Sequence, residues 1–323
     1  MTTERPSLDT AAAVTYVPIE RTLLLALSRL PTDVYALDGA NHVLVAEAAS
    51  ATATLASGPS GRLFVRGDAL AAVRHALPEA IEALIATQLH SAEARLGATY
   101  ETIATAIAPL FVSGGVLGSE DLTAIESMAD VLSDLMHEDI RWFHDLAHAM
   151  DHGPGWHLHA LNSSIYAIAI AVRRDLPGDE VRRIGRGAFL LDIGKTQLPA
   201  ELLERQGALS EEEWGLMRNH PWLGADLVRR LRPGQPPDYL DLIRDHHERL
   251  DGSGYMLGLR GTELPLAIQI AAVVDVFDAM TARRPHRGPE TVFHTLRQMR
   301  VDMAGMLSDE VILELIQTLG RRR

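Results

Sequence analysis

The sequence predicts a mainly α-helical protein, in which an all-helical C-terminal domain follows a small α/β module and a helical connector. Three observations predict this fold class. Apolar residues recur at helical spacing over most of the chain after residue 79, β-type segments are confined to about the first 77 residues, and 323 residues suffice for two or three compact units. We therefore expect domains at residues 1–78, 79–152 and 153–323.

The N-terminal module is predicted from three short segments rich in β-type residues: Asp33–Leu37, His42–Ala46 and Leu63–Val65. Turn-forming clusters at residues 38–41 and 58–61 separate these segments. This pattern is typical of a small α/β unit with a sensory role. It does not identify the signal that the module would sense.

The connector is rich in Ala and Leu and has hardly any Pro or Gly outside residues 114–118, which predicts helical hairpins that act as a linker or a homodimer contact. The C-terminal domain keeps the helical spacing, and Pro and Gly return between its segments. Within it, Ser210 and Glu213 have the spacing of a capping box. We expect a helix to begin there and to run toward His220.

Composition restricts the function. A net charge of -13 argues against a nucleic-acid polymer as partner and leaves a small anionic ligand held by local arginines. The chain has no cysteine, so any metal would be bound by His, Asp and Glu. No apolar run approaches the roughly 18 residues of a membrane span, and the N-terminus lacks the layout of a secretory signal. These features predict a cytoplasmic protein without a membrane span.

Asp192 is the first residue whose chemistry needs an explanation. It lies in the apolar run 188–193, where we expect a buried helix, and an unsatisfied carboxylate there costs several kcal/mol. Lys195 follows at i+3, close enough on a helix to pair with it. Two readings remain open at this point: a buried ion pair, or a metal-bridging carboxylate with Lys195 facing a substrate phosphate.

Four histidines and a second aspartate add to this pattern. His246 and His247 are adjacent before a glycine-rich turn, and both can bind one metal only near a helix end or in a deep pocket. His159 and His220, taken singly, are most simply helix-packing histidines. Asp275, however, lies in another apolar run, where an unpaired charge is costly. A metal centre would explain all of these residues together.

The order and spacing of these segments resemble a known family. From about His159 to Val311 the chain is similar to an HD-GYP domain, the branch of the HD phosphohydrolases that hydrolyses cyclic di-GMP. The matching segments begin at His159 (HALN), Leu191 (LDIGK), His220 (HPWLG), His246 (HHERLDGSGYM) and Asp275 (DVFDAMTARRPHR). The segment from His246 to Tyr255 is very specific. Residues 16–19 and 30–35 resemble, less specifically, a small domain often found ahead of HD-GYP domains.

The resemblance implies a centre of two or three divalent metal ions, usually iron or manganese, that activates a hydroxide for attack on phosphorus. The implied ligands of one metal are His220, His246 and His247, with Asp192 bridging to a second metal held by His159 and Asp275. Asp192 and Lys195 would be the catalytic residues.

The resemblance also implies contacts to the ligand. Lys195 would orient a phosphate, and Arg284 and Arg287 would bind the phosphates of cyclic di-GMP. Gly254 and Tyr255 would shape a loop beside the site, where a glycine lets the backbone approach the ligand.

The sequence departs from the family pattern at its name-giving position, because Leu191 stands where the HD dyad has its histidine. Leu191 continues the apolar stripe of Val181, Ile184 and Ala188, so we expect it in the core. The second metal would then be weakly bound or absent, whereas the first keeps its full ligand set. Gly155 occupies the place of the glutamate that binds a third metal in some relatives, so no third metal is expected.

Milder departures lie around the site. Met256 stands where the motif has proline, and Ala160, His286 and residues 306–308 also differ from the pattern. A separate set of histidines, His137, His144, His148 and His152, has the spacing of one face of a helix, where a solvated face is favoured over a metal site.

Two main functions follow from the resemblance. The favoured one is a metal-dependent cyclic di-GMP phosphodiesterase with reduced or altered activity. The alternative is an inactive HD-GYP module that binds cyclic di-GMP or a partner protein as a scaffold in signalling. Hydrolysis of a different phosphoester is a third reading.

Overall fold

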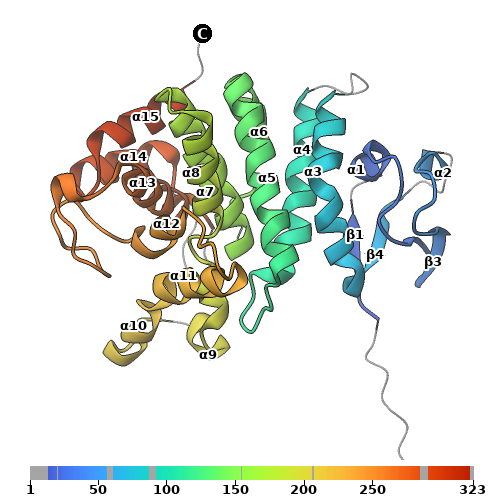
Figure 1. Ribbon diagram of the computed structural model, residues 1–323, viewed down its shortest axis with the longest axis horizontal. Coiled ribbons are helices and arrows are strands. Elements are labelled where there is room, and N and C mark those ends of the chain that lie inside the picture. The colour runs from blue at the N-terminus through green and yellow to red at the C-terminus, as the bar shows by residue number, and fades with distance from the viewer. Residues whose placement is uncertain are drawn as a thin grey trace, which may run out of the picture.

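The computed structural model describes residues 14–19, 21–56, 61–86, 92–153, 155–205, 207–283 and 290–320. A small β-sheet lies at one end of the molecule, long paired helices follow it, and the C-terminal half forms a helical bundle at the other end (Figure 1). The predicted fold class, mainly α with a small N-terminal sheet, is confirmed.

The N-terminal sheet has four antiparallel strands in the order β1-β4-β2-β3. They are β1 (Tyr16–Ile19), β2 (Val34–Asp38), β3 (Asn41–Ala46) and β4 (Leu63–Arg66). The last three correspond to the predicted segments. The sequence reading missed β1 because Pro18 interrupts its short β pattern. Proline cannot donate to a neighbouring strand, and its place on an edge strand makes it acceptable.

The helices of the first half pack directly on one another. They are α1 (Arg21–Ala26), α2 (Ala53–Ala56), α3 (Leu70–Ala86), α4 (Ala92–Ile107), α5 (Ser119–Glu138) and α6 (Arg141–Ala149), with 3₁₀ turns η1 (Gly67–Ala69) and η2 (Ala108–Leu110). Helix α3 contacts α1, α4 and α5, and the buried apolar residues form one continuous cluster from the sheet to α15. The predicted boundary between residues 78 and 79 falls inside α3. The three predicted domains, 1–78, 79–152 and 153–323, stay predictions.

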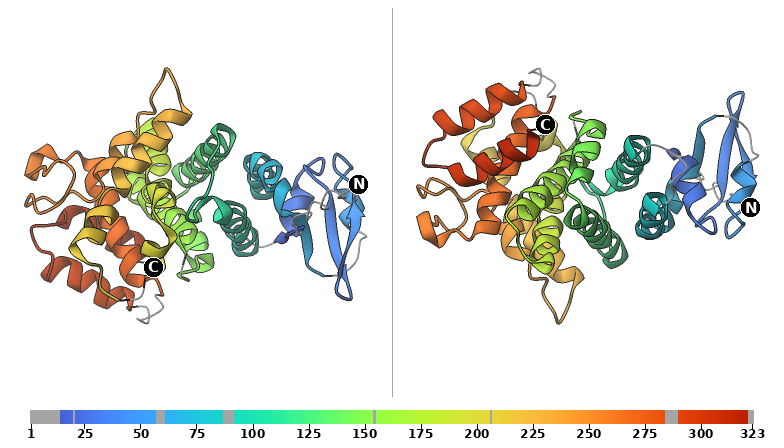
Figure 2. Two further views of the ribbon diagram at one scale, coloured as in Figure 1. Left: turned by 90° about the horizontal axis from the view of Figure 1, so that it is seen from below. Right: turned by 90° about the horizontal axis from the view of Figure 1, so that it is seen from above.

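The C-terminal bundle surrounds helix α7. Its α-helices are α7 (Trp156–Arg173), α8 (Gly178–Phe189), α9 (Ala200–Leu203), α10 (Glu211–Met217), α11 (His220–Leu231), α12 (Leu240–Asp245), α13 (Leu266–Thr281), α14 (Val292–Val301) and α15 (Asp309–Leu319), with η3 (Ile193–Gln197) and η4 (Gly261–Glu263). Residues 160–171 of α7 are all buried, as expected of a helix that is apolar on every side. Helices α5, α8, α13 and α15 cover it, and Figure 2 shows this bundle and the sheet at opposite ends of the molecule.

Two predictions about helix ends have different outcomes. The capping box is confirmed, because the Ser210 hydroxyl accepts a hydrogen bond from the Glu213 backbone N–H and the Glu213 carboxylate accepts one from the Ser210 N–H. The prediction that Asp192 lies on a helix is wrong. Helix α8 ends at Phe189, and Asp192 lies in the turn before η3.

The turn places Gly194 against the start of α11. A Cβ atom there would lie 1.9 Å from the carbonyl oxygen of His220, so only glycine fits at this contact. Glycine is also a poor helix former, which favours the end of α8 before it. No helix in the described part of the chain is long and apolar enough to cross a membrane.

Candidate metal centre

Five segments of the C-terminal bundle bring the predicted metal ligands to one buried place. Helix α7 carries His159 in its first turn, the turn after α8 carries Asp192, α11 begins with His220, the chain directly after α12 carries His246 and His247, and α13 carries Asp275. Only the folded chain assembles these side chains, since more than a hundred residues separate His159 from Asp275.

Asp192 lies between the two halves of this cluster. Its Oδ1 atom is 3.1 Å from His220 Nε2, and its Oδ2 atom is 3.6 Å from His159 Nε2. His159 Nε2 lies 3.3 Å from Asp275 Oδ1. One carboxylate therefore faces both groups of predicted ligands, as a bridging carboxylate would.

The first half of the cluster is complete. Asp192, His220, His246 and His247 each offer a ligand atom, and these four atoms lie within 4.8 Å of one another. His246 is fully buried and His220 nearly so. Helix α12 ends at Asp245, which satisfies the condition that two adjacent histidines can share a metal near a helix end.

The tautomers of two histidines test whether a metal fits here. His220 Nδ1 lies 2.8 Å from the carbonyl oxygen of Met217, and His246 Nδ1 lies 2.9 Å from that of Ile243, so both Nδ1 atoms carry the proton and donate it. Their Nε2 atoms, 3.4 Å apart, then face each other with lone pairs. Two acceptors at this distance, beside the buried Asp192 carboxylate, fit a cation between them.

The second half of the cluster is supported by Asp278, which the sequence reading missed. Its Oδ2 atom accepts a hydrogen bond of 2.8 Å from His159 Nδ1, so that Nε2 points toward the other carboxylates. Its Oδ1 atom accepts one of 3.0 Å from Asn162, whose own oxygen accepts one of 2.8 Å from the Tyr100 hydroxyl. A second buried Asp one helical turn after Asp275 was a signal that could have identified it.

His246 and His247 of the first half are neutral at ordinary pH. Burial lowers the pKa of His246 to about 4. Burial, together with the charge of His246, holds the pKa of His247 well below its usual value. Neutral imidazoles keep the lone pairs that a metal requires, so protons compete little at this half of the cluster.

The other half of the cluster contains buried carboxylates, whose negative charge needs a nearby positive charge. Burial would raise the pKa of Asp192, but the nearby Lys195 ammonium lowers it well below the usual range. Burial would lower the pKa of His159, but its contacts with Asp275 and Asp278 outweigh this and raise it to about 10. In the metal-free protein a proton on His159 offsets these carboxylates, in the place where a metal ion would do so.

Leu191 adds no ligand atom to this half. Its side chain is only 1% exposed and belongs to the apolar core, as do Val181, Ile184 and Ala188. The predicted core stripe is therefore confirmed, although Leu191 lies beyond the end of α8.

The other histidines do not share one helix, so that prediction is wrong. His137 lies in α5, whereas His144 and His148 lie in α6 after a break in the chain. His152 follows α6, and its Nδ1 atom lies 3.5 Å from Asp278 Oδ1. The break at residues 139–140 separates His137 from the other three.

The predicted ligand-contacting residues lie beside the cluster where the structure describes them. Lys195 Nζ is 2.5 Å from Asp192 Oδ2, which confirms the predicted pairing. The Tyr255 ring stacks on His247, with 4.7 Å between centroids. Arg284 and Arg287 lie outside the described residues.

The loop after the histidine pair has a buried anchor that the sequence reading also missed. The Glu248 carboxylate is fully buried and accepts hydrogen bonds from the backbone N–H groups of Leu257, Gly258 and Leu259. A Cβ atom on Gly254 would lie 2.5 Å from the Glu248 backbone. In this structure the glycine lets the loop approach its own backbone, a role different from the predicted approach to a ligand.

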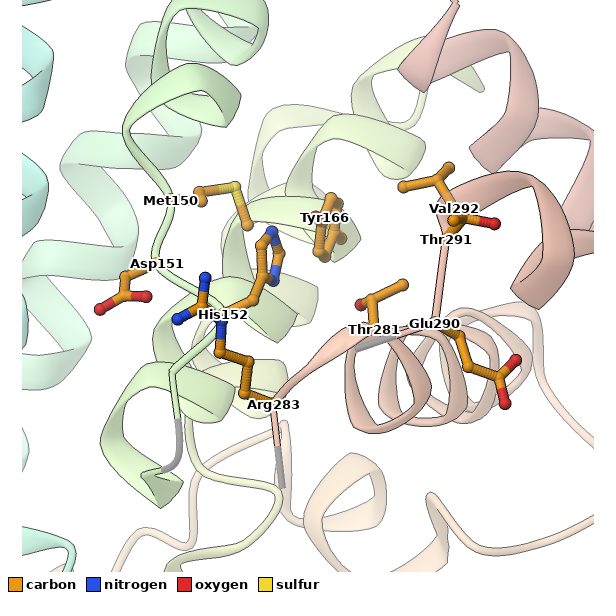
Figure 3. A pocket seen from close by; sticks show the side chains of 9 residues that line it. All are labelled: Met150, Asp151, His152, Tyr166, Thr281, Arg283, Glu290, Thr291 and Val292. Carbon is orange, nitrogen blue, oxygen red and sulfur yellow. The ribbon is translucent and has the colours of Figure 1, made fainter. Parts of the chain in front are cut away.

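A cavity of about 410 Å³ lies behind the second half of the cluster, on the side of His152. Side chains from α7, α13, α14 and the segment after α6 surround it, among them Tyr166, Thr281 and Arg283 (Figure 3). None of the described metal-cluster residues lines it, so this cavity is distinct from the metal cluster.

Comparison with known proteins agrees with this site. The family model described as an HD domain matches residues 131–310. A cyclic di-GMP phosphodiesterase of Pseudomonas aeruginosa is 32% identical over 164 residues, which cover 51% of this chain and 39% of that protein. The cyclic di-GMP phosphodiesterase response regulator RpfG of Xanthomonas campestris is 41% identical over 123 residues, 36% of this chain and 31% of that one.

A further relative extends the comparison. The 3'3'-cGAMP-specific phosphodiesterase 2 of Vibrio cholerae is 32% identical over 133 residues, 41% of this chain and 26% of that protein. The match thus spans well under half the length of these curated relatives.

Among solved structures, Bd1817, an HDG"Y"P protein from Bdellovibrio bacteriovorus, aligns with a TM-score of 0.62 at 16% identity, covering 94% of this chain and 99% of that one, which shows a shared fold. With a family match over more than half of its length and the HD-GYP motifs gathered around one buried cluster, the chain belongs to the HD-GYP branch of the HD domain family.

Proposed function

We propose that this chain is a metal-dependent phosphodiesterase that hydrolyses cyclic di-GMP with reduced or altered activity. One observation carries the proposal: Asp192, His220, His246 and His247 each offer a ligand atom, and the four atoms lie within 4.8 Å of one another. The names of the relatives support the substrate, since several are cyclic di-GMP phosphodiesterases. Leu191 is the reason to expect reduced activity.

The two halves of the cluster would bind metal unequally. The first set would hold one divalent ion firmly, with iron or manganese suited to its mixture of imidazole and carboxylate ligands. The second set retains His159, Asp192 and Asp275, and a metal there would be weakly bound or absent. A bound metal would supply Lewis-acid activation of water and of a phosphate oxygen.

The chain's own residues would position the substrate. The Lys195 ammonium, 21% exposed and paired with Asp192, lies where it can donate to a phosphate oxygen while keeping the carboxylate ionised. Asp278 and Asn162 would keep His159 oriented through its Nδ1 proton. Arg284 and Arg287 stay proposed phosphate contacts.

A second candidate is a catalytically inactive module that binds cyclic di-GMP or a partner protein. The burial of Leu191 in the apolar core favours it, because the lost ligand has no replacement among the described side chains around Asp192. In this case the first metal would serve structure or nucleotide binding alone.

The test combines metal content with cyclic di-GMP turnover, measured anaerobically with iron and separately with manganese. Turnover by the wild type, with the product identified by chromatography as linear dinucleotide or GMP, supports the phosphodiesterase. One metal per chain with no product, while cyclic di-GMP still binds, supports the inactive module.

Asp192→Asn keeps the shape of the side chain and should abolish turnover and lower metal content. Asp121→Asn is the matched control, because Asp121 is also a largely buried carboxylate, paired with Arg74 away from the cluster. Activity that survives Asp192→Asn would show that the site assignment is wrong.

A further inference from the structure

A stack of planar side chains, here called the ladder, leads from the cluster of predicted metal ligands to the surface; its members are Tyr255, Arg218 and Trp214. The Tyr255 ring stacks on His247 with an interplanar angle of 27°. The guanidinium carbon of Arg218 lies 5.7 Å from the centroid of Tyr255 and 5.8 Å from that of Trp214. Arg218 is therefore held between two aromatic rings, one of which touches a predicted metal ligand.

Arg218 has its hydrogen-bonding capacity available. It is exposed, and in the described ranges none of the ion pairs of the chain includes it, whereas Arg205 and Arg230 pair with Glu213 and Asp226. Five N–H donors in a planar fork thus remain for a ligand. Trp214 is 48% exposed beside it, which leaves a large apolar face in contact with water.

The backbone holds this ladder in place. The Ser210 capping box begins α10, which carries Trp214, and the Arg218 N–H donates to the Trp214 carbonyl at 2.9 Å. Two residues later the chain enters α11 at His220, whose ring is part of the cluster. Trp214, Arg218 and the predicted metal ligand His220 are therefore parts of one continuous segment.

We infer that Arg218 is a specificity-determining residue that recognises guanine in the dinucleotide through its N–H donors, while Trp214 and Tyr255 hold its guanidinium plane. The inference rests on the proposed function. Guanine presents two acceptors, O6 and N7, that match the fork of an arginine, whereas adenine presents a donor, its amino group, in place of O6. A protein with a net charge of -13 also needs such a local cation near an anionic ligand.

The experiment measures affinity rather than activity. Isothermal titration of the manganese-loaded full chain uses phosphorothioate analogues of cyclic di-GMP and cyclic di-AMP, which keep the bases and resist hydrolysis. Arg218→Ala should weaken binding of the guanine analogue roughly tenfold and change binding of the adenine analogue much less. Trp214→Ala should also weaken binding of the guanine analogue, by a smaller factor, because Arg218 loses one of the two rings that hold it.

The matched control is Arg229→Ala. Arg229 is an exposed arginine in the last turn of α11, about 13 Å along the helix from His220, so its loss changes the net charge equally at a distance from the cluster. This variant should bind both analogues like the wild type. Metal content and the melting temperature of every variant establish that the fold is kept.

Two results separate this inference from the proposed function. If the wild type binds the guanine analogue and Arg218→Ala binds it equally well, or loses both analogues by the same factor, guanine recognition by Arg218 is wrong while the proposed function stands. If the manganese-loaded wild type binds no guanine analogue, the proposed function fails and the inference fails with it.

Discussion

Replacing Leu191 by histidine restores the family's missing ligand at a buried position. Leu191 is 1% exposed, so losing its burial costs about 2 kcal/mol of stability. A buried imidazole without a hydrogen-bond partner adds roughly 1–3 kcal/mol. The metal-free Leu191→His variant should therefore be less stable than the wild type by about 3–5 kcal/mol.

If the new imidazole binds metal, the metal should offset much of this loss of stability. A ligand present at 100 times its dissociation constant stabilises the folded state by about 2.7 kcal/mol. Urea unfolding after chelation and again with manganese measures both quantities, and elemental analysis should show metal content rising toward two per chain.

Leu190→His is the matched control, since Leu190 is the preceding residue and is equally buried. It should lose similar stability and recover less with manganese. The reasoning is refuted if Leu191→His gains no metal and no more stability with manganese than Leu190→His does, which would mean that the core has closed around position 191.

Three more predictions follow from the site. Asp278→Asn should weaken binding of the second metal about 10- to 100-fold by loosening His159, measured by manganese titration of the chelated protein. Met256 has a φ of 102°, so Met256→Gly should raise the free energy of unfolding by about 1 kcal/mol, whereas Met256→Pro should lower it because proline cannot adopt this angle. Burial lowers the pKa of His246 from 6.5 to about 4. Between these two pH values His246 is protonated in the unfolded state and neutral in the folded state, so lowering the pH favours unfolding. The metal-free protein should lose on the order of 3 kcal/mol between pH 6.5 and 4, and urea unfolding of His246→Gln should show a smaller loss.

The helical architecture could be predicted from apolar spacing, and burial singled out two aspartates, whereas the set of six predicted ligands came from the resemblance to the HD-GYP family. Asp192 and Asp275 lie in apolar runs where charge needs a partner, and the histidine pair precedes a distinctive glycine-rich turn. In the structure each of the six lies within 3.6 Å of at least one other.

What the sequence did not show depends on contacts between distant segments. The end of α8 before Asp192 accompanies a close approach of Gly194 to α11, and no local pattern encodes this contact. Glu248 reads as an ordinary charged residue, yet its carboxylate holds three backbone N–H groups of a loop that closes onto it. The break in the histidine stripe likewise follows from a turn with no Gly or Pro to mark it.

The chain of hydrogen bonds that orients His159 includes a residue outside the range that the family model matches. Tyr100 belongs to α4, more than thirty residues before the matched range begins at 131, yet its hydroxyl holds Asn162, which holds Asp278, which holds His159. A fragment cut at the family boundary would therefore lose part of the scaffold that fixes a metal ligand. In the intact chain, a shift of α4 relative to α7 would reach His159, a proposed metal ligand, through three hydrogen bonds, which would couple the connector to the proposed metal centre.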